Sequence, residues 1–252
     1  MGKIQAGVCV KDLCQCSSAL RALSNRYVGF VDDEHFYKCV EKVCGKYAKL
    51  GGQTTKDLLL ESVADPFKMI FDMGNRGAPP EVWEEADAHR IRDKSLNNSI
   101  GEFHQAVLGG VEGWESFSKG HPFGIDLARE DNTMFIELKN KYNTLNGSKK
   151  DALRDKLASI LRQHPKAKCY WAYILSRDST SGECEWVYRK SRNPNIRKAW
   201  GRMAYGIVTG SPFSLSEMWE ALPRAMFDIT NKKMPDASIS WASEWLKYAT
   251  GI

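Results

Sequence analysis

Apolar positions in the first 95 residues recur at helical spacing and predict a mainly helical N-terminal region. The expected helices cover residues 12–24, 33–50, 55–64 and 80–94. The last of these begins with proline, carries glutamates in its first turn and has basic residues in its last turn, which suits the helix dipole at both ends.

One apolar cluster lies just before the fourth expected helix. It contains Phe67, Met69, Ile70, Phe71 and Met73. Packing in the core is the simplest interpretation of such a cluster. Contact with a partner or a second subunit is the alternative.

The pattern changes after residue 96, where strands and helices alternate. Asn97, Asn98 and Ser99 are expected to cap a helix over residues 100–108, which two glycines end. We expect strands at 113–119, 123–128, 133–138, 169–175, 185–189 and 204–208, and helices at 151–164, 214–226 and 237–248.

Three of these elements carry further expectations. The almost wholly apolar strand at 169–175 should be central, with the strand at 185–189 paired to it or next to it. Pro223 should interrupt the helix at 214–226. Trp241 and Trp245, one turn apart near the C-terminus, should be anchored in the core.

This order of elements predicts an α/β (α+β) fold, in which helices flank a mixed β-sheet. We expect two regions. Residues 1–95 form a helical region packed on the core, and residues 96–252 form the core itself, which ends in helices.

Two strands around the polar turn at 129–132 bring charged residues together. Glu137 and Lys139 are two apart on one strand, so their side chains project from the same face. If the strand at 123–128 pairs antiparallel with it, Asp126 lies beside them. Two carboxylates and an ammonium in a small volume predict a site for a divalent cation. The alternative is an edge strand whose Glu137 and Lys139 are merely solvated.

Oxygen ligands of this kind suit Mg²⁺, with Mn²⁺ as a substitute. A metal with a neighbouring lysine fits phosphodiester hydrolysis, since both can stabilise negative charge on a phosphorus centre. The chain has no G-x-S-x-G, Walker A loop, dinucleotide glycine fingerprint or H-E-x-x-H. Acyl transfer and nucleotide binding of those kinds are therefore disfavoured.

Composition adds a few limits. A chain of 252 residues with 42% hydrophobic content can bury a full core, and its net charge of +5 permits a nucleic-acid partner without requiring one. Seven cysteines in a chain of this length indicate reduced thiols. A zinc site at Cys9, Cys14 and Cys16 is the alternative to apolar packing of these side chains. No signal-peptide pattern or long apolar run occurs, so we expect no membrane partner.

The charged hairpin also carries a resemblance. Gly124-Ile125-Asp126, followed after the turn by Ile136-Glu137-Leu138-Lys139, resembles the PD-(D/E)xK nuclease motif, although Ile125 replaces its proline. Residues 100–110, His121-Pro122 and residues 139–148 are similar to a family of type II restriction endonucleases that acts on GGNCC-like sites. The resemblance covers about residues 60–190.

The resemblance implies roles for four residues. Asp126 and Glu137 would bind the metal, Lys139 would be the catalytic lysine, and Glu102 could complete the metal environment from its helix. For Glu102, a polar position on an exposed helix face is the alternative.

The segment after Lys139 is rich in hydrogen-bonding side chains and is expected to contact DNA, with a plain polar connector as the alternative. The residues concerned are Lys141, Asn143, Thr144, Asn146, Ser148 and Lys149. Residues 177–181 and 189–198 form a second basic candidate, although such a charge run is usually a solvated face.

These observations predict a Mg²⁺-dependent type II restriction endonuclease that cuts both strands of a specific double-stranded DNA site. We expect a homodimer, because a two-fold site is matched by a two-fold protein, in the cytoplasm of a prokaryotic cell. The alternatives are a structure-specific or repair nuclease of the same fold and a non-catalytic DNA-binding protein.

Overall fold

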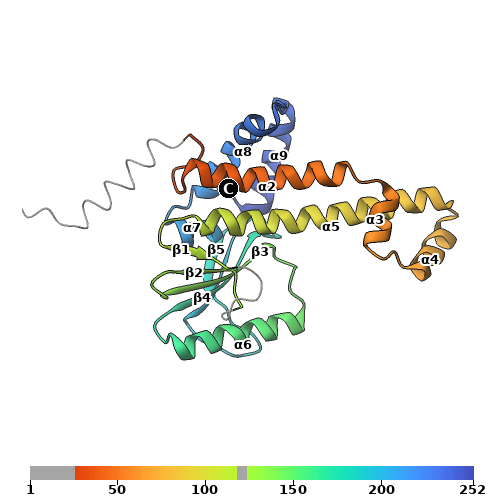
Figure 1. Cartoon of the computed structure of the whole chain (residues 1–252). Coiled ribbons are helices and arrows are strands. Elements are labelled where there is room, and N and C mark those ends of the chain that lie inside the picture. The colour runs from red at the N-terminus through yellow and green to blue at the C-terminus, as the bar shows by residue number, and fades with distance from the viewer. Residues whose placement is uncertain (1–25, 118–123) are drawn as a thin grey trace, which may run out of the picture.

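A computed structural model of the chain describes residues 26–117 and 124–252 (Figure 1). The helix expected at 12–24 and the cluster Cys9, Cys14 and Cys16 lie outside these residues. The helices are α2 (Asp33–Gly51), α3 (Thr55–Glu61), α4 (Pro66–Arg76), α5 (Pro80–Gly109), α6 (Gly147–Gln163), α7 (Arg202–Thr209), α8 (Ser214–Thr230) and α9 (Asp236–Thr250).

A mixed sheet organises the molecule, as predicted. Its strands are β1 (Trp114–Ser116), β2 (Leu127–Arg129), β3 (Met134–Lys141), β4 (Lys168–Leu175), β5 (Gly182–Glu185) and β6 (Ile196–Trp200). They lie in the order β1-β2-β3-β4-β6-β5. The pairs β3–β4 and β4–β6 are parallel and the others antiparallel. The apolar strand β4 is central, as its sequence predicts.

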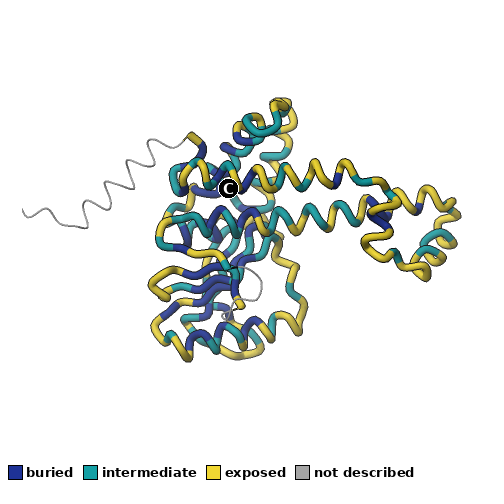
Figure 2. Tube along the Cα trace, in the orientation of Figure 1, coloured by how far each residue is buried: buried dark blue, intermediate teal, exposed yellow. Residues whose placement is uncertain are grey.

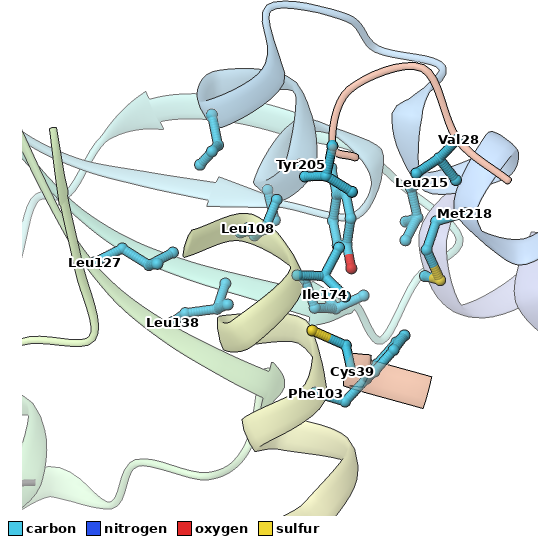
Figure 3. Packing of buried hydrophobic residues seen from close by; sticks show 14 of the residues in the cluster. Val28, Cys39, Phe103, Leu108, Leu127, Leu138, Ile174, Tyr205, Leu215 and Met218 are labelled. Atoms are coloured by element: carbon cyan, nitrogen blue, oxygen red, sulfur yellow. The ribbon is translucent and has the colours of Figure 1, made fainter. Parts of the chain in front are cut away.

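Helices cover both faces of this sheet, so alternate strand residues enter different cores. Leu138 of β3 and Ile174 of β4 join α2, α5, α7 and α8 in the larger core, where Figure 3 shows Ile174 near Phe103 and Tyr205, and Leu138 near Leu127. Phe135 of β3 and Trp171 of β4 point the other way. They pack against the apolar stripe of α6.

The helices α2 and α5 lie side by side and extend beyond the sheet, with α3 and α4 at their far end (Figure 1). The prediction of two separate helices at 80–94 and 100–108 is wrong, because α5 runs without a break from Pro80 to Gly109. Asn97 does not cap a new helix. Its side-chain amide donates to the Asp93 carbonyl one turn earlier, 3.0 Å away. The expected boundary between residues 95 and 96 falls within this helix.

The apolar cluster at 67–73 is not core, contrary to the simplest interpretation. No residue of α4 is buried, and Phe67, Ile70 and Phe71 are 79%, 69% and 71% exposed. Figure 2 shows the exposed tip formed by α3 and α4. The reason is position: α4 lies at the end of the helical extension, away from the sheet.

Two expectations for the second half of the sheet are also wrong. Residues 204–208 form helix α7 rather than a strand, and Ala204, Tyr205 and Val208 are buried at helical spacing. The strand expected at 185–189 lies at 182–185 and pairs with β6 at the edge, not with β4. The strand β6, which was not predicted, separates them.

The C-terminal helices differ from expectation as well. Pro223 lies inside α8 without ending it, because the buried Met218, Ala221 and Ala225 hold the helix against the larger core. Trp241 and Trp245 are 66% and 57% exposed rather than anchored in the core. None of the helices in the described part of the chain is long and apolar enough to cross a membrane.

Candidate active site

The hairpin of β2 and β3 sets the position of Asp126. Asn132 takes a left-handed conformation in the turn, with φ of 57°, and Asp131 accepts a hydrogen bond from the Thr133 amide at 3.0 Å. The resulting register pairs Leu127 with Ile136. The amide of Asp126 donates to the Ile136 carbonyl at 3.1 Å, so the next position along places Asp126 beside Glu137.

Three of the predicted site residues meet on this hairpin. The Lys139 ammonium lies 3.1 Å from Asp126 Oδ2 and 2.8 Å from Glu137 Oε1. The Leu138 amide also donates to Asp126 Oδ2, at 2.8 Å. The side chains of Asp126, Glu137 and Lys139 are 23%, 12% and 25% exposed, so the cluster is largely sheltered but open on one side.

The charges of this cluster shift two pKa values. Burial, and then the charge of Glu137, raise the pKa of Asp126 above its usual range, although Lys139 opposes the shift. Burial works against the charged form of Lys139, but the two carboxylates outweigh it and raise the pKa of this lysine. Lys139 is therefore protonated at neutral pH.

The donor set fits a hard divalent cation. Asp126 and Glu137 offer carboxylate oxygens, which Mg²⁺ prefers, and Mg²⁺ commonly keeps several waters and substrate phosphate oxygens as its other ligands. Among residues 26–117 and 124–252, no cluster of three or more His, Cys, Asp or Glu side chains is placed to hold a metal ion. Asp126 and Glu137 are the two carboxylates that the described residues bring together at this hairpin.

Glu102 does not join these two carboxylates. It faces α2, where Lys42 lies 3.6 Å from its carboxylate, and its side chain is 49% exposed. From α5, Gln105 makes polar contacts with the hairpin. Its side-chain amide donates to the carbonyls of Phe117 and Asp126, both at 3.1 Å, and so connects α5 to the segment that carries Asp126.

A fourth charged side chain reaches the cluster from α6. The Lys156 ammonium lies 3.4 Å from Glu137 Oε2 and donates to the carbonyl of Gly124. The sequence gives only a weak signal for this role, because Lys156 is one of several basic residues that flank the apolar stripe of α6.

The expected DNA-binding residues lie at the end of β3, on the connection to α6 and in the first turn of α6. Lys141, Asn143, Thr144, Asn146, Ser148 and Lys149 are all exposed. The helix begins at Gly147, earlier than the expected residue 151, and Asn146 caps it by accepting from the Lys149 amide at 3.0 Å. Because Lys141 projects from the same face of β3 as Glu137 and Lys139, this connection starts beside the cluster.

Together, a hairpin with these charged residues, a helix before it and a helix with a parallel strand after it form a restriction-endonuclease-like core. Comparison with known proteins gives the family. The family model described as Eco47II restriction endonuclease matches residues 28–231, and this chain belongs to that family.

Two curated relatives agree with this result. The type II restriction enzyme Sau96I of Staphylococcus aureus is 31% identical over 218 residues, which cover 82% of this chain and 82% of that enzyme. The type II restriction enzyme Eco47II of Escherichia coli is 31% identical over 225 residues, which cover 84% of this chain and 91% of that enzyme.

Proposed function

We propose that this type II restriction endonuclease uses Mg²⁺ to hydrolyse phosphodiester bonds in both strands of a GGNCC-like double-stranded DNA site, within the bacterial cytoplasm. The observation that carries the proposal is the cluster of Asp126, Glu137 and Lys139, in which one ammonium lies within 3.1 Å of two carboxylates. Family membership supports the restriction activity, and the resemblance of residues 100–148 to enzymes of this specificity supports the site.

Each residue of the cluster has a role under this proposal, which assigns the chain to the PD-(D/E)xK nucleases. Asp126 and Glu137 would hold the metal, which would supply stabilisation of negative charge and a bound water of lowered pKa. Lys139 is protonated and orients or stabilises the attacking group and the charge on the phosphate. The Leu138 amide fixes Asp126 through its hydrogen bond at 2.8 Å. Mn²⁺ should substitute for Mg²⁺.

Glu102 stays in the proposal as a third acidic residue of the metal environment. It would have to leave Lys42, and this exchange is inexpensive because exposed ion pairs contribute at most about 1 kcal/mol. Glu102→Gln tests the role. A lower cleavage rate with an increased Mg²⁺ requirement supports it, and an unchanged Mg²⁺ titration removes Glu102 from the site.

The exposed connection between β3 and α6 would contact the duplex. Lys141 and Lys149 supply positive charge for phosphates, and Asn143, Thr144 and Ser148 supply donors and acceptors. The side-chain oxygen of Asn146 caps the helix, and its side-chain amide hydrogens remain available to donate to DNA.

A second copy of the chain would provide the second cluster that cutting both strands requires. We propose that the copies meet through one apolar face of α4, on which the exposed Phe67, Ile70 and Phe71 lie at helical spacing. Its two phenylalanines alone expose roughly 300 Å², a good part of the about 800 Å² that each partner of a stable dimer buries. Residues 55–86 carry three basic and seven acidic side chains, so this surface is unsuited to DNA.

Supercoiled plasmid incubated with Mg²⁺ tests the function. Discrete fragments whose sequenced ends share one motif are expected from the unaltered protein, and no cleavage with retained DNA binding is expected from Lys139→Ala. A smear or nicks at unrelated sequences would favour a structure-specific nuclease. Intact DNA would favour a non-catalytic binding protein, and full activity of Lys139→Ala would overturn the assignment of the site.

A further inference from the structure

A second lysine, Lys156 of α6, lies at the proposed metal site. Leu153, Leu157 and Ile160 are buried against the sheet, and they fix the rotation of α6. Lys156 precedes Leu157 and is directed toward the hairpin. Its side chain is 36% exposed, so it is partly held by the protein and is not simply solvated.

Lys156 contacts both segments that carry the carboxylates, which are β3 and the residues just before β2. On one side its ammonium lies 3.4 Å from Glu137 Oε2, whereas Lys139 lies 2.8 Å from the other oxygen, Oε1. On the other side it donates to the carbonyl of Gly124. Gly124 has φ of +60°, and a Cβ there would lie 3.5 Å from Lys156 Cε. The lysine stem therefore packs along this turn.

These contacts distinguish Lys156 from the other basic residues of α6. Lys150 lies 5.4 Å from the centre of the Trp171 ring, and Arg154 donates to the Trp186 carbonyl at 2.6 Å. Both therefore contact tryptophan residues rather than the carboxylates. Lys156 is the basic residue of α6 for which the described structure shows a contact with the carboxylate cluster.

We propose that Lys156 is a positioning residue that sets the geometry of Asp126 and Glu137 for the metal. It holds the Glu137 oxygen that does not face Lys139, and it holds the backbone two residues before Asp126. One ammonium thus links the two segments and fixes the separation of the two carboxylates. This inference rests on the proposed function, because it assumes that these carboxylates bind the metal.

A purely electrostatic role of Lys156 would change the metal affinity in the opposite direction. If Lys156 acted only as a positive charge near the site, it would repel a divalent ion, and its removal would strengthen metal binding. If it positions Glu137, its removal leaves the carboxylate free to rotate and weakens metal binding. Partners that orient metal ligands typically contribute 10- to 100-fold in affinity or activity.

The experiment measures Mn²⁺ binding to the full chain by calorimetry, without DNA. Lys156→Met keeps most of the stem and removes the ammonium, and we expect its Kd for Mn²⁺ to rise about 10- to 100-fold. Lys156→Arg keeps donors and charge and should recover most of the affinity. Arg162→Met removes one charge from an exposed position of the same helix and should leave the Kd unchanged.

Cleavage supplies a second readout. At limiting Mg²⁺, Lys156→Met should cut slowly, and saturating Mg²⁺ should restore kcat to within a few-fold of the unaltered protein. Thermal unfolding of each variant checks the fold, and Lys156→Gln replaces Lys156→Met, with the same expected direction, if the methionine variant does not fold.

The outcomes separate this inference from the proposed function. Unchanged or tighter Mn²⁺ binding in Lys156→Met, with normal binding by the unaltered protein, would overturn the positioning role alone. Failure of the unaltered protein to bind Mn²⁺ would overturn the metal site together with the inference.

Discussion

Lys139 lies between two carboxylates, and at the scale of single residues this arrangement determines what each substitution should do. Asp126 and Glu137 are alike in charge but differ in surroundings. Asp126 is also fixed by the Leu138 amide, whereas Glu137 is shared between two lysines. Replacing one residue therefore changes the partners of the others, and the single effects should not add.

Asp126→Asn should reduce kcat by about a hundredfold or more, because bound metal supplies several kcal/mol of charge stabilisation and each 1.36 kcal/mol is tenfold in rate. Asparagine can still accept from the Leu138 amide, so thermal stability should change little. Steady-state cleavage across a Mg²⁺ titration checks this. A normal Mg²⁺ response in the variant would point to other ligands.

His104 should make the fold sensitive to mild acid. It is buried beside Tyr205, with Nδ1 2.8 Å from the phenol oxygen, and burial lowers the pKa of His104 to about 4. An unfolded histidine titrates near 6.5, so between these values the unfolded chain binds more protons. The free energy of unfolding therefore falls as the pH falls through this window, by about 2 kcal/mol at pH 5 from this residue.

Urea unfolding at pH 7 and pH 5 measures this loss. His104→Asn keeps a polar atom near the position of Nδ1 and does not titrate, so its loss between the two pH values should be smaller by about 2 kcal/mol. The same loss in both proteins would show that other groups cause the acid sensitivity.

At the scale of elements, Asn146 caps α6 and, under the proposed function, also lies in the segment that would contact DNA. Asn146 is the N-cap of α6, and its side chain accepts a hydrogen bond from the Lys149 amide. Its part in capping is therefore separate from any part in binding DNA.

Two substitutions distinguish these parts. Asn146→Ala should cost about 1 kcal/mol of stability through the lost cap. Asn146→Asp should keep the cap but weaken DNA binding, because it adds a negative charge beside the phosphates. Thermal unfolding and metal-free DNA binding at fixed salt measure the two effects. Unchanged DNA affinity in Asn146→Asp would place the duplex elsewhere.

At the scale of the whole molecule, the exposed tip formed by α3 and α4 is the feature that a single chain does not explain. The other side of α4 is fixed to α5, since the Trp83 indole donates to Asp72 at 3.0 Å. This contact directs the apolar side of α4 outward, as expected for a surface that binds another copy of the chain.

Phe67→Asp combined with Ile70→Glu should convert a dimer into a monomer, because both charges would be buried in the proposed interface. Sedimentation measures the mass. Phe213→Asp, which removes a comparably exposed aromatic outside the tip, serves as the control. The monomer should bind DNA weakly and lose coordinated cutting of both strands. A dimer that persists in the double variant would place the interface elsewhere.

Most helices, the central strand and the charged hairpin follow from local patterns in the sequence. Alternation along β3 places Glu137 and Lys139 on one face, and a short polar turn brings Asp126 back beside them. The strand alternation and the turn depend on residues close in sequence. The sequence alone therefore predicts that these three side chains lie together.

The tertiary structure decided what depends on distant neighbours. Whether residues 204–208 become helix or strand, and whether α4 is covered, depends on which elements pack against them, and periodicity cannot show this. For the same reason Glu102 pairs with Lys42, while Gln105 and Lys156 reach the hairpin that holds Asp126, Glu137 and Lys139. The sequence alone thus determined the chemistry of this hairpin, and only the packing of α5 and α6 against the sheet decided which side chains support it, because that packing fixes the rotation of each helix.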